Sequence, residues 1–422
     1  MNNKIIIYGD DPRCTTGFAL VVRNMVQAAE QAGLVPVIVG KGSAHPDIKY
    51  GHPVINANER GDAYGWKTLE EALQSSGARV VVTVGDPWDL QHLYGIKKQF
   101  PFFWIGYTPV EAEPFPAWIP MAGKPGQYFD VGKLFGSTDH VVAYTHFGKT
   151  AIEKSIAEYN ELADTPVAPR IAQVYHGVDT DFFKPMDRVK ARKALADLGI
   201  NKDDILFTTI KTNSTRAGFD TLFDAWDVYR KSVPRAIASR SKLYMHTTPD
   251  GPAYPLPAMC HHYGCAGSVI FDRTIVPGAG VTNERMRHIY NATDVFLSTA
   301  RGEGFGLPVA EAMACGVPVI VPDYAGPAEY VGAGGYKIPI IATYQPELLY
   351  TRFAIVDAVA MADRMRILAT VPAERGKTGI AARKEIQAYP WTRFHDAFAV
   401  IMQDGIVAAE KMDFNAVKGD WV

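Results

Sequence analysis

The sequence predicts an α/β protein with two doubly wound domains, and three observations support this prediction. The chain has 422 residues, and two domains of roughly 180–220 residues each are the natural division of that length. Short apolar runs alternate with longer segments of helical periodicity. This alternation occurs twice, once before a charged seam at Asp179–Asp204 and once after it, which favours two parallel sheets over a single long one.

Most of the apolar runs are continuous, as is typical of parallel strands that are buried on both faces. Between the first two runs, residues 18–29 follow helical spacing, with Thr16 as a plausible N-cap and Gly33 where the helix would stop. A closing helix is expected after Trp391. We expect strands at Lys4–Tyr8, Val35–Val39, Val80–Val84, Phe102–Tyr107, His140–Ala143, Gln173–Tyr175, Ile205–Ile210, Leu243–His246, Val269–Phe271, Val295–Ser298 and Val317–Val321.

The composition gives no general electrostatic drive toward nucleic acid or anionic membranes, because the formal net charge is −2. No apolar run approaches the ~18 residues of a membrane span. The first expected strand begins directly after the N-terminal residues 1–3, so we expect no signal peptide. The four cysteines are too few and too scattered for a disulfide framework, which favours a reducing cytoplasm. They are Cys14, Cys260, Cys265 and Cys315.

The most informative segment, Ser298–Gly316, has the pattern of a strand, a glycine loop, a short helix and a stop. Gly304 and Gly306 allow tight turns and a close approach of the backbone to a ligand. Pro308 fits the first helical turn, and free N–H groups there would form an anion site suited to phosphate. Glu303 and Glu311 flank the loop, where carboxylates suit sugar hydroxyls. The same pattern is also compatible with a purely structural βα turn.

The spacing Glu303-Gly-Phe-Gly-Leu-Pro-x-x-Glu311 resembles the two-glutamate motif of retaining GT-B glycosyltransferases of family 4, the glycosyl transferases group 1. Neighbouring segments match in the same order: residues 289–295 upstream, residues 318–329 downstream, 175–185 at the entry to the second domain, and Pro390-Trp391 before the closing helix. The resemblance is specific over about residues 170–395 and looser in the first domain.

This resemblance implies a GT-B fold, in which two Rossmann-like doubly wound domains face each other across a cleft. The expected divisions are an acceptor-side domain at 1–180, a nucleotide-sugar domain at 181–390, and a C-terminal helix and tail at 391–422 that return toward the first domain. It also implies that the configuration of the transferred sugar is retained by a front-face mechanism, in which the departing phosphate helps to deprotonate the acceptor. No side chain suggests a covalent nucleophile.

By the same resemblance, Glu311 should hold the donor ribose and Glu303 the transferred sugar. The backbone around Gly304, Phe305, Gly306 and Leu307 should cradle the diphosphate. The family usually has a basic pair on the first loop of the second domain. Here Arg216 fits that pair, but Ala217 stands where the family commonly has lysine, so that Lys211 is the candidate for the second charge. Both could instead be ordinary solvated charges.

Two loops of the first domain are further candidates. Gly17 follows the loop after the first strand, where the family approaches the donor phosphate or the acceptor. Arg13 in that loop could add charge, or simply pair with Asp10 or Asp11. Glu111 follows an apolar strand at the expected carboxyl edge of the sheet and is the best polar candidate of this domain. A surface glutamate in a proline-rich loop is the alternative.

Three other patterns are interpreted as structural. Cys260, His261 and His262 are consecutive and close a tetrahedral zinc site poorly, even with Cys265 nearby. Asp179-Thr-Asp181 spells a D-x-D sequence, but it lies within the family-like seam, so we expect neither a metal nor another cofactor. The run 230–242 carries five basic residues and no acid. A solvated helix end explains this run, and a weak contact with a membrane or polyanion is the alternative.

The sequence therefore predicts a retaining hexosyl- or pentosyltransferase that uses a nucleotide-diphosphate sugar. The acceptor is open among glycans, proteins, small molecules and nucleic acid, and the sugar, base and oligomeric state are open as well. A GT-B-fold epimerase or phosphorylase is the alternative among enzymes. A non-catalytic nucleotide-sugar-binding protein is the alternative outside them.

Overall fold

The computed structural model describes residues 3–45, 48–115, 117–120, 128–275, 280–345 and 351–412. The chain divides into two compact units. The first takes in residues 1–177, 346–351 and 391–422, and the second takes in residues 178–345 and 352–390. The chain thus first passes between units at Gly177–Val178, next to the division at 180/181 expected from the sequence.

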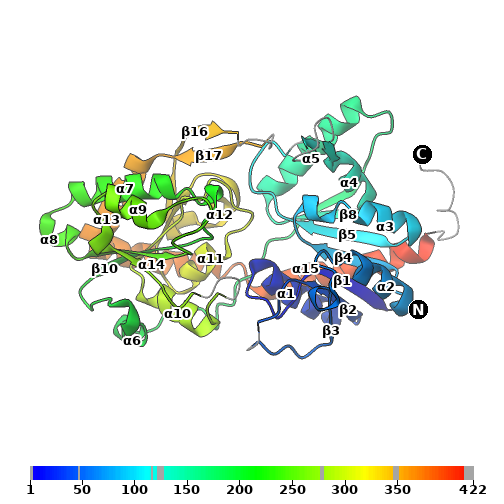
Figure 1. Cartoon of the computed structure of the whole chain (residues 1–422), viewed down its shortest axis with the longest axis horizontal. Coiled ribbons are helices and arrows are strands. Elements are labelled where there is room, and N and C mark those ends of the chain that lie inside the picture. The colour runs from blue at the N-terminus through cyan, green and yellow to red at the C-terminus, as the bar shows by residue number, and fades with distance from the viewer. Residues whose placement is uncertain are drawn as a thin grey trace. The chain divides into compact units, whose positions relative to one another are not determined.

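The first unit is built on a seven-stranded parallel sheet with the order β3-β2-β1-β4-β5-β8-β9 (Figure 1). Successive strands run outward from β1 in one direction and then from β4 in the other, which makes the sheet doubly wound. A small antiparallel pair, β6 with β7, lies outside it. The strands are β1 (Lys4–Asp10), β2 (Val35–Lys41), β3 (Val54–Asn56), β4 (Val80–Val84), β5 (Phe103–Thr108), β6 (Trp118–Pro120), β7 (Tyr128–Asp130), β8 (His140–Ala143) and β9 (Arg170–Gln173).

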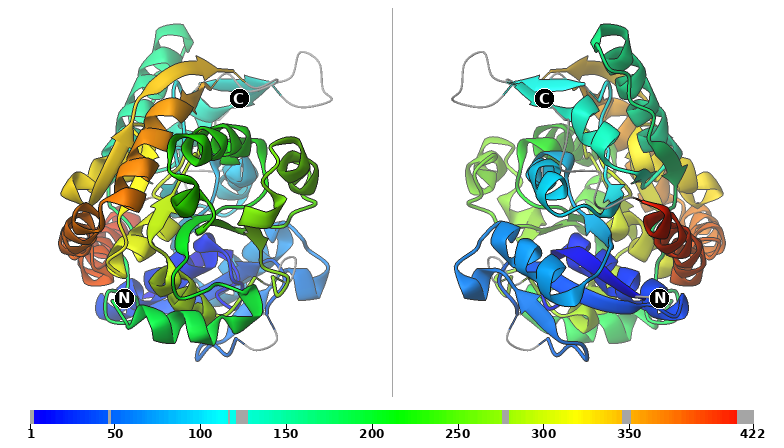
Figure 2. Two further views of the ribbon diagram at one scale, coloured as in Figure 1. Left: turned by 90° about the vertical axis from the view of Figure 1, so that its left-hand side faces the viewer. Right: turned by 90° about the vertical axis from the view of Figure 1, so that its right-hand side faces the viewer.

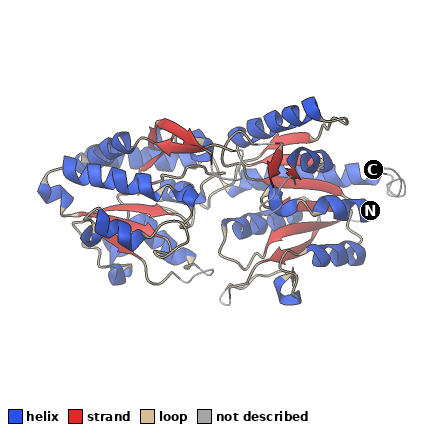
Figure 3. Cartoon of the chain, turned by 45° about the horizontal axis from the view of Figure 1, so that its top comes forward, coloured by secondary structure: helices blue, strands red, loops and turns tan. Residues whose placement is uncertain are grey.

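Helices cover both faces of this sheet (Figure 3). The first helix begins as predicted, because the Thr16 hydroxyl accepts a hydrogen bond of 3.0 Å from the N–H of Ala19. The C-terminal helix packs against this first helix (Figure 2). On the opposite face, Ile6 and Tyr8 join side chains of α2 and α3 in a hydrophobic cluster. The helices are α1 (Gly17–Gln31), α2 (Trp66–Ser76), α3 (Leu93–Gln99), α4 (Val131–Ser137), α5 (His146–Leu162) and α15 (Trp391–Lys411).

The second unit repeats this plan on a six-stranded parallel sheet with the order β12-β11-β10-β13-β14-β15. An antiparallel pair, β16 with β17, lies beside it. The strand order reverses between β10 and β13, so this sheet is also doubly wound. The strands are β10 (Ile205–Ile210), β11 (Ser241–His246), β12 (Val269–Phe271), β13 (Val295–Leu297), β14 (Val319–Pro322), β15 (Gly335–Ile338), β16 (Ile340–Tyr344) and β17 (Phe353–Val356).

Among the described residues of the second unit, one hydrophobic cluster lies on each face of the sheet. The larger joins α7, α9 and α13 to one face of the sheet, and the smaller joins α6 and α10 to the other. None of the helices in the described residues is long and apolar enough to cross a membrane. The helices are α6 (Arg188–Ala194), α7 (Phe219–Ser232), α8 (Arg235–Ala238), α9 (Leu256–His262), α10 (Asn283–Ala292), α11 (Leu307–Ala314), α12 (Ala325–Tyr330), α13 (Ala358–Thr370) and α14 (Pro372–Ile386).

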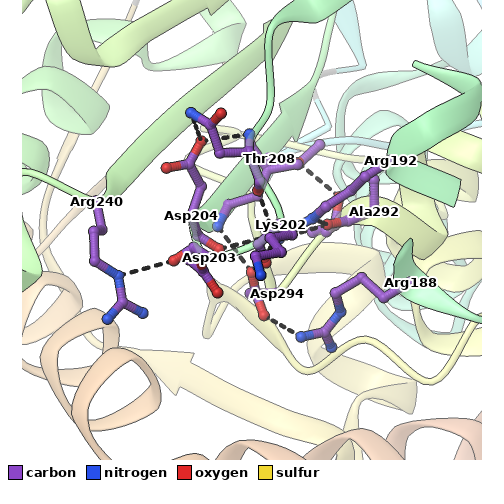
Figure 4. A network of polar contacts seen from close by, with 12 residues as sticks. Arg188, Arg192, Lys202, Asp203, Asp204, Thr208, Arg240, Ala292 and Asp294 are labelled. Atoms are coloured by element: carbon purple, nitrogen blue, oxygen red, sulfur yellow. Dashed lines mark hydrogen bonds and ion pairs between the residues drawn. The ribbon is translucent and has the colours of Figure 1, made fainter. Parts of the chain in front are cut away.

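A buried ionic network fastens the two central strands of this unit (Figure 4). Asp294 precedes β13, and its Oδ2 accepts hydrogen bonds from the Arg192 guanidinium at 2.7 Å and from the N–H of Leu206 at 2.9 Å. Arg192 is 5% exposed and also donates to the carbonyl of Ala292. Since buried charges are stable only when they are paired and hydrogen-bonded, this network holds the beginnings of β10 and β13 in register.

Candidate active site

The central feature of the second unit is the switch point between β10 and β13. These strands are parallel neighbours, so their carboxyl ends lie at the same edge of the sheet. The loop 211–218 follows β10, and the loop 298–306 follows β13. Crevices at such a reversal of strand order are the usual ligand sites of open α/β sheets. Most of the candidates that the sequence indicated in this unit, including Lys211, Arg216, Glu303 and the glycine loop, lie in these two loops.

Backbone contacts hold the two loops against each other. Gly218 has a φ of +67°, and a Cβ atom there would lie 2.2 Å from the carbonyl oxygen of Thr299. The Thr299 hydroxyl donates a 3.0 Å hydrogen bond to the carbonyl of Ala217. The N–H of Arg301 donates to the carbonyl of Arg216 at 2.9 Å. The half-buried Arg216 therefore lies on a turn that is anchored directly to the glutamate-bearing loop.

Helix α12 fixes the glycine loop from the other side. Gly306 has a φ of +88°. A Cβ atom added at this position would lie only 2.9 Å from Cγ of Pro327. The buried hydroxyl of Tyr330 lies 3.0 Å from each of the carbonyl oxygens of Phe305 and Gly306. The N–H of Gly326 donates to the carbonyl of Glu303 at 3.1 Å. The conformation of this loop therefore depends on residues some twenty positions downstream.

Helix α11 begins directly from this loop. Gly306 is its N-cap residue, no side chain caps it, and a proline stands in its first turn, as the sequence predicted for Pro308. Its last residues are followed by Gly316 with a φ of +76°, the expected helix stop. Because the helix start lacks a side-chain cap and carries the positive end of the helix dipole, it is suited to an anionic group.

Glu303 forms an ion pair with Lys211, the first residue after β10. Both side chains are only partly exposed, at 22% and 15%. This pair joins the two loops across the switch point. Because the lysine is the direct partner of Glu303, the ion pair holds the carboxylate in one orientation at the edge of the sheet.

Glu311 has a different environment. The hydroxyl of Tyr290, a buried residue of α10, donates to its Oε2 at 2.6 Å. Removal from solvent raises the pKa of Glu311 to about 7, although the hydrogen bond from Tyr290 acts in the opposite direction. Burial without a cationic partner is a common cause of such a shift in carboxyl groups.

Sequence reasoning missed Arg301 as a part of this region. Its guanidinium forms an ion pair with Asp220 in the first turn of α7, donates to the Tyr344 hydroxyl at 3.1 Å, and lies 4.9 Å from the centre of that ring. It therefore joins the glutamate loop to α7 and β16. Tyr330 was missed as well. Neither residue has a sequence signal of its own, since each acts through segments that are distant in the chain.

The candidates of the first unit lie at the carboxyl edge of its own sheet. Gly17 is the first residue of α1, directly after the N-cap Thr16. The guanidinium of Arg13 donates two hydrogen bonds to Asp11, at 2.9 and 2.7 Å, so the local ion pair that the sequence offered as one alternative is present. Glu111 is half-buried in the loop after β5.

The patterns interpreted as structural have local explanations. Asp179 Oδ1 accepts hydrogen bonds from the N–H groups of Asp181 and Phe182, which fixes a turn. Cys260 and Cys265 are buried, whereas His261 and His262 are exposed. Within the described residues, no group of three or more histidine, cysteine or acidic side chains is arranged to hold a metal ion.

Comparison with known proteins identifies similar families and similar folds. Residues 270–354, which include the glutamate loop and α11, match the family described as Glycosyl transferases group 1. The structure is similar over 96% of the chain to the sucrose-phosphate synthase of Thermosynechococcus elongatus (TM-score 0.66, 18% identity, 98% of that chain). It is equally similar to the trehalose 6-phosphate synthase of Burkholderia multivorans (TM-score 0.67, 15% identity, 96% of this chain and 99% of that one). The predicted fold class is confirmed: the two units are Rossmann-like doubly wound domains, and the chain has the GT-B fold.

Curated relatives are similar to a part of this chain. A D-inositol 3-phosphate glycosyltransferase of Geodermatophilus obscurus is 25% identical over 236 residues, which are 56% of this chain and 47% of that protein. A lipopolysaccharide core biosynthesis mannosyltransferase of Rhizobium meliloti is 29% identical over 203 residues, 46% of this chain and 52% of that protein. The chain thus spans about half the length of the curated relatives that it matches. The resemblance to the group 1 glycosyltransferases stated from the motif is confirmed.

Proposed function

We propose that this protein transfers a sugar from a nucleoside-diphosphate sugar to an acceptor hydroxyl, with retention of configuration. The observation that carries the proposal is the arrangement at the β10/β13 switch point. One carboxyl group, Glu303, is paired with a lysine, and the other, Glu311, is held by a tyrosine, on either side of a glycine loop that begins a helix. Similar structures include the Anabaena HepE protein in complex with UDP and glucose (TM-score 0.66, 13% identity over 95% of this chain).

In this proposal each part of the site has its own role. Glu311 accepts hydrogen bonds from the ribose, and Glu303 accepts them from the sugar that is transferred. The N–H groups of the loop 304–307 and the charge of Arg216 stabilise the diphosphate as it leaves, an electrostatic contribution to catalysis. Lys211 orients Glu303 through their ion pair, rather than serving only as a second phosphate ligand. In the first unit, Gly17 and Glu111 belong to the donor-phosphate and acceptor side.

Exchanging the two glutamates for glutamine tests the roles. A contact that is equal in the ground and transition states changes mainly KM, whereas a contact that strengthens as the sugar becomes cation-like changes kcat. Glu311→Gln should therefore raise the donor KM and weaken calorimetric binding of the free nucleoside diphosphate. Glu303→Gln should lower kcat with little change in nucleotide affinity. Loss of nucleotide binding in Glu303→Gln alone would reverse the roles, and no effect in either variant would contradict the proposal.

We further propose that transfer needs neither a divalent metal nor another cofactor, because cationic side chains and helix N–H groups are available for the phosphates. Activity should survive EDTA, and Asp179→Ala and Asp181→Ala should retain it. A requirement for added Mn²⁺ or Mg²⁺, together with loss of activity in Asp179→Ala or Asp181→Ala, would contradict this. Four buried, unpaired cysteines are consistent with a reducing cytoplasm as the working compartment.

A panel of nucleoside-diphosphate sugars separates the proposal from its alternatives. Transfer to an acceptor, or slow donor hydrolysis, supports a glycosyltransferase. Release of a free epimer or of a sugar phosphate identifies an epimerase or phosphorylase, and binding without any turnover identifies a non-catalytic protein. The acceptor is identified afterwards by supplying glycans, small polyols, peptides and nucleic acid with the donor that is hydrolysed.

A further inference from the structure

An exposed aromatic cluster lies at the carboxyl edge of the sheet in the first unit. Tyr64, Trp66 and Trp88 are 64%, 43% and 41% exposed, and no other phenylalanine, tyrosine or tryptophan side chain of the described residues is exposed to this degree. Tyr64 and Trp66 follow β3, whereas Trp88 follows β4. Since both strands belong to one parallel sheet, these residues share its carboxyl edge with Gly17 and Glu111. Exposed apolar side chains are ordinary when they are scattered, but a gathered set marks a binding surface.

His92 joins the two loops into one surface. Its ring stacks on the ring of Trp66, with 4.6 Å between their centres and 24° between their planes, and the ring of Tyr64 lies 5.3 Å from that of Trp66. Trp88 and His92 are four residues apart on backbone that is helical from residue 87 to residue 99, so their side chains lie on the same face of it. Burial lowers the pKa of His92 to about 3, so its ring is uncharged at neutral pH. These four side chains form one surface, the aromatic platform.

Polar contacts beneath the aromatic platform fix its rings in place. The hydroxyl of Tyr8 on β1 donates to the carbonyl of Tyr64 and lies 3.2 Å from Nε2 of His92, so one side chain of the sheet holds both loops. Asp62 accepts a hydrogen bond of 3.2 Å from the N–H of Trp66, the first residue of α2. Aromatic side chains that are already fixed lose little conformational entropy when a ligand binds to them.

The charges around the aromatic platform disfavour a polyanionic ligand. The segments 57–68 and 85–92, which carry the platform, contain four acidic and two basic residues. Lys41 lies 5.2 Å from the centre of the Tyr8 ring, and the acidic residues outnumber the basic ones even when this lysine is added. Nucleic acid and anionic membranes require an excess of cations. The exposed Asp89 repels phosphate groups, but its carboxylate accepts hydrogen bonds from hydroxyl groups.

A sugar ring has the surface that this arrangement fits. Its hydroxyl groups lie around the rim, whereas its faces carry C–H groups that pack on a flat aromatic ring. Aromatic walls combined with a few polar groups are the usual composition of sites for small organic ligands. One exposed aromatic ring covers one sugar residue, so three exposed rings on two neighbouring loops favour several consecutive sugar residues over a small polyol.

We propose that the aromatic platform binds an oligosaccharide, which is the acceptor of the transfer reaction. Sugar rings pack on Trp66 and Trp88, and the Asp89 carboxylate accepts hydrogen bonds from their hydroxyl groups. The role as acceptor rests on the proposed function, whereas the binding of an oligosaccharide does not. The proposal selects glycans from the acceptor classes that the sequence left open.

The test uses the full chain and measures binding separately from transfer. A printed array of α- and β-linked hexose and hexosamine oligosaccharides identifies the glycan that is bound most tightly, and calorimetry then measures its affinity. Trp88→Ala removes an exposed ring, Trp88→Phe keeps a flat ring, and Trp88→Leu keeps an apolar side chain without a flat face. Trp66→Ala repeats the test on the other loop. Val35→Ala is the control, because Val35 is exposed at the start of β2 and thus at the amino edge of the same sheet.

We expect the unaltered chain to bind an oligosaccharide of the array, and Trp88→Ala and Trp66→Ala to weaken this binding about tenfold or more, the scale of truncating an aromatic side chain at the centre of a binding surface. Trp88→Phe should retain most of the affinity, and Trp88→Leu should lose as much as Trp88→Ala. Val35→Ala should bind as the unaltered chain does. Full affinity in Trp88→Leu, equal losses in Trp88→Ala and Val35→Ala, or binding of no glycan on the array would overturn the proposal.

The outcome for the aromatic platform is distinguishable from the outcome for the proposed function. Donor hydrolysis without binding of any glycan would overturn the platform proposal and leave the proposed function intact. Glycan binding that depends on Trp66 and Trp88, in a chain that neither transfers nor hydrolyses any donor, would support the platform as a glycan site and contradict the proposed function. If both hold, the bound glycan becomes glycosylated, and Trp88→Ala raises its KM as an acceptor by the factor by which it weakens binding.

Discussion

At the scale of single residues, the two glutamates of one short motif have opposite electrostatic environments. Glu303 faces the ammonium group of Lys211, whereas Glu311 accepts a hydrogen bond from the neutral phenol of Tyr290, and desolvation raises the pKa of its carboxyl group. An ion pair with a lysine and a hydrogen bond from a tyrosine hold a carboxyl group by different interactions. The two groups should therefore respond differently to the loss of their partners.

The raised pKa of Glu311 predicts a pH dependence of nucleotide binding. Ribose hydroxyls donate to the ionised carboxylate, and the pKa of this group in the free protein is about 7. Affinity should therefore be full above this pH and fall about tenfold per unit below it. Tyr290→Phe removes the hydrogen bond that lowers this pKa, so the loss should begin at a higher pH. Calorimetric measurement of nucleotide affinity between pH 5.5 and 8.5 checks this prediction. The variant Glu311→Gln lacks the titrating carboxyl group, so it shows how much of the pH dependence comes from the nucleotide itself. An identical pH dependence in Glu311→Gln and the unaltered chain would contradict it.

A double-mutant cycle tests the proposed role of Lys211. If this lysine acts by orienting Glu303, then Lys211→Met and Glu303→Gln remove the same interaction, and the loss of kcat/KM in the double variant should be smaller than the sum of the single losses. The coupling should amount to about 1–3 kcal/mol for groups in contact. If Lys211 instead binds phosphate, Lys211→Met will weaken binding of the nucleoside diphosphate and the two losses will add.

At the scale of elements, the close approach of the loops 211–218 and 298–306 depends on Gly218. Gly199 is a suitable control position for a substitution at Gly218. Gly218 and Gly199 both have positive φ angles, of 67° and 64°, but only Gly218 has a neighbour within reach of a Cβ, the Thr299 carbonyl oxygen at 2.2 Å. Gly199→Ala should cost only backbone strain of about 1–2 kcal/mol. Gly218→Ala should cost a further 1–3 kcal/mol for the steric overlap and should reduce donor turnover. Chemical denaturation and a hydrolysis assay check both, and equal stability losses would contradict the assigned contact.

The strand predictions were correct where the strand is buried on both faces of the sheet. The runs at Val80–Val84 and Ile205–Ile210 match β4 and β10 because continuous apolar sequence is itself the signal of such strands. The other edge strands were harder to predict than β12, which matches the strand predicted at Val269–Phe271. The strand predicted at Gln173–Tyr175 is wrong except for its first residue, since β9 covers Arg170–Gln173 and has exposed and half-buried residues. The edge strands β3 and β15 were not predicted, because each is short and incompletely buried.

In the candidate site, too, the locally encoded features could be predicted and the long-range contacts could not. The spacing of Glu303, the glycine loop and Glu311 is local, so one sequence was sufficient to identify these residues as candidates. The side chains that hold them come from elsewhere in the chain. Tyr290 reaches Glu311 from α10, and Tyr330 reaches the loop from α12. Contacts of this kind arise from the packing of helices on a sheet, which residue spacing along the chain does not specify.

At the scale of the whole molecule, the course of the chain places the C-terminal helix in the first unit, as the resemblance implied. The chain leaves the second unit at Pro390, and α15 then belongs to the first unit. Its buried Phe398 lies 4.9 Å from the ring of Tyr107 on β5, centre to centre. The core of the first unit is therefore completed by the last segment of the chain, so its folding depends on residues that follow the entire second unit.

This dependence predicts that damage to α15 destabilises one unit. Phe398→Ala should cost the first unit about 3–5 kcal/mol, the usual cost of removing a buried phenylalanine side chain. Val400→Ala, at a position that is 58% exposed on the same helix, should cost well under 1 kcal/mol. Hydrogen exchange followed by mass spectrometry locates the effect, because local opening raises exchange only in the segments that open. With Phe398→Ala, exchange should increase in β1, β4, β5 and α1, while β10, β11 and α7 keep their protection. A parallel increase in both sets would mean that the two units unfold as one cooperative body and would contradict the prediction.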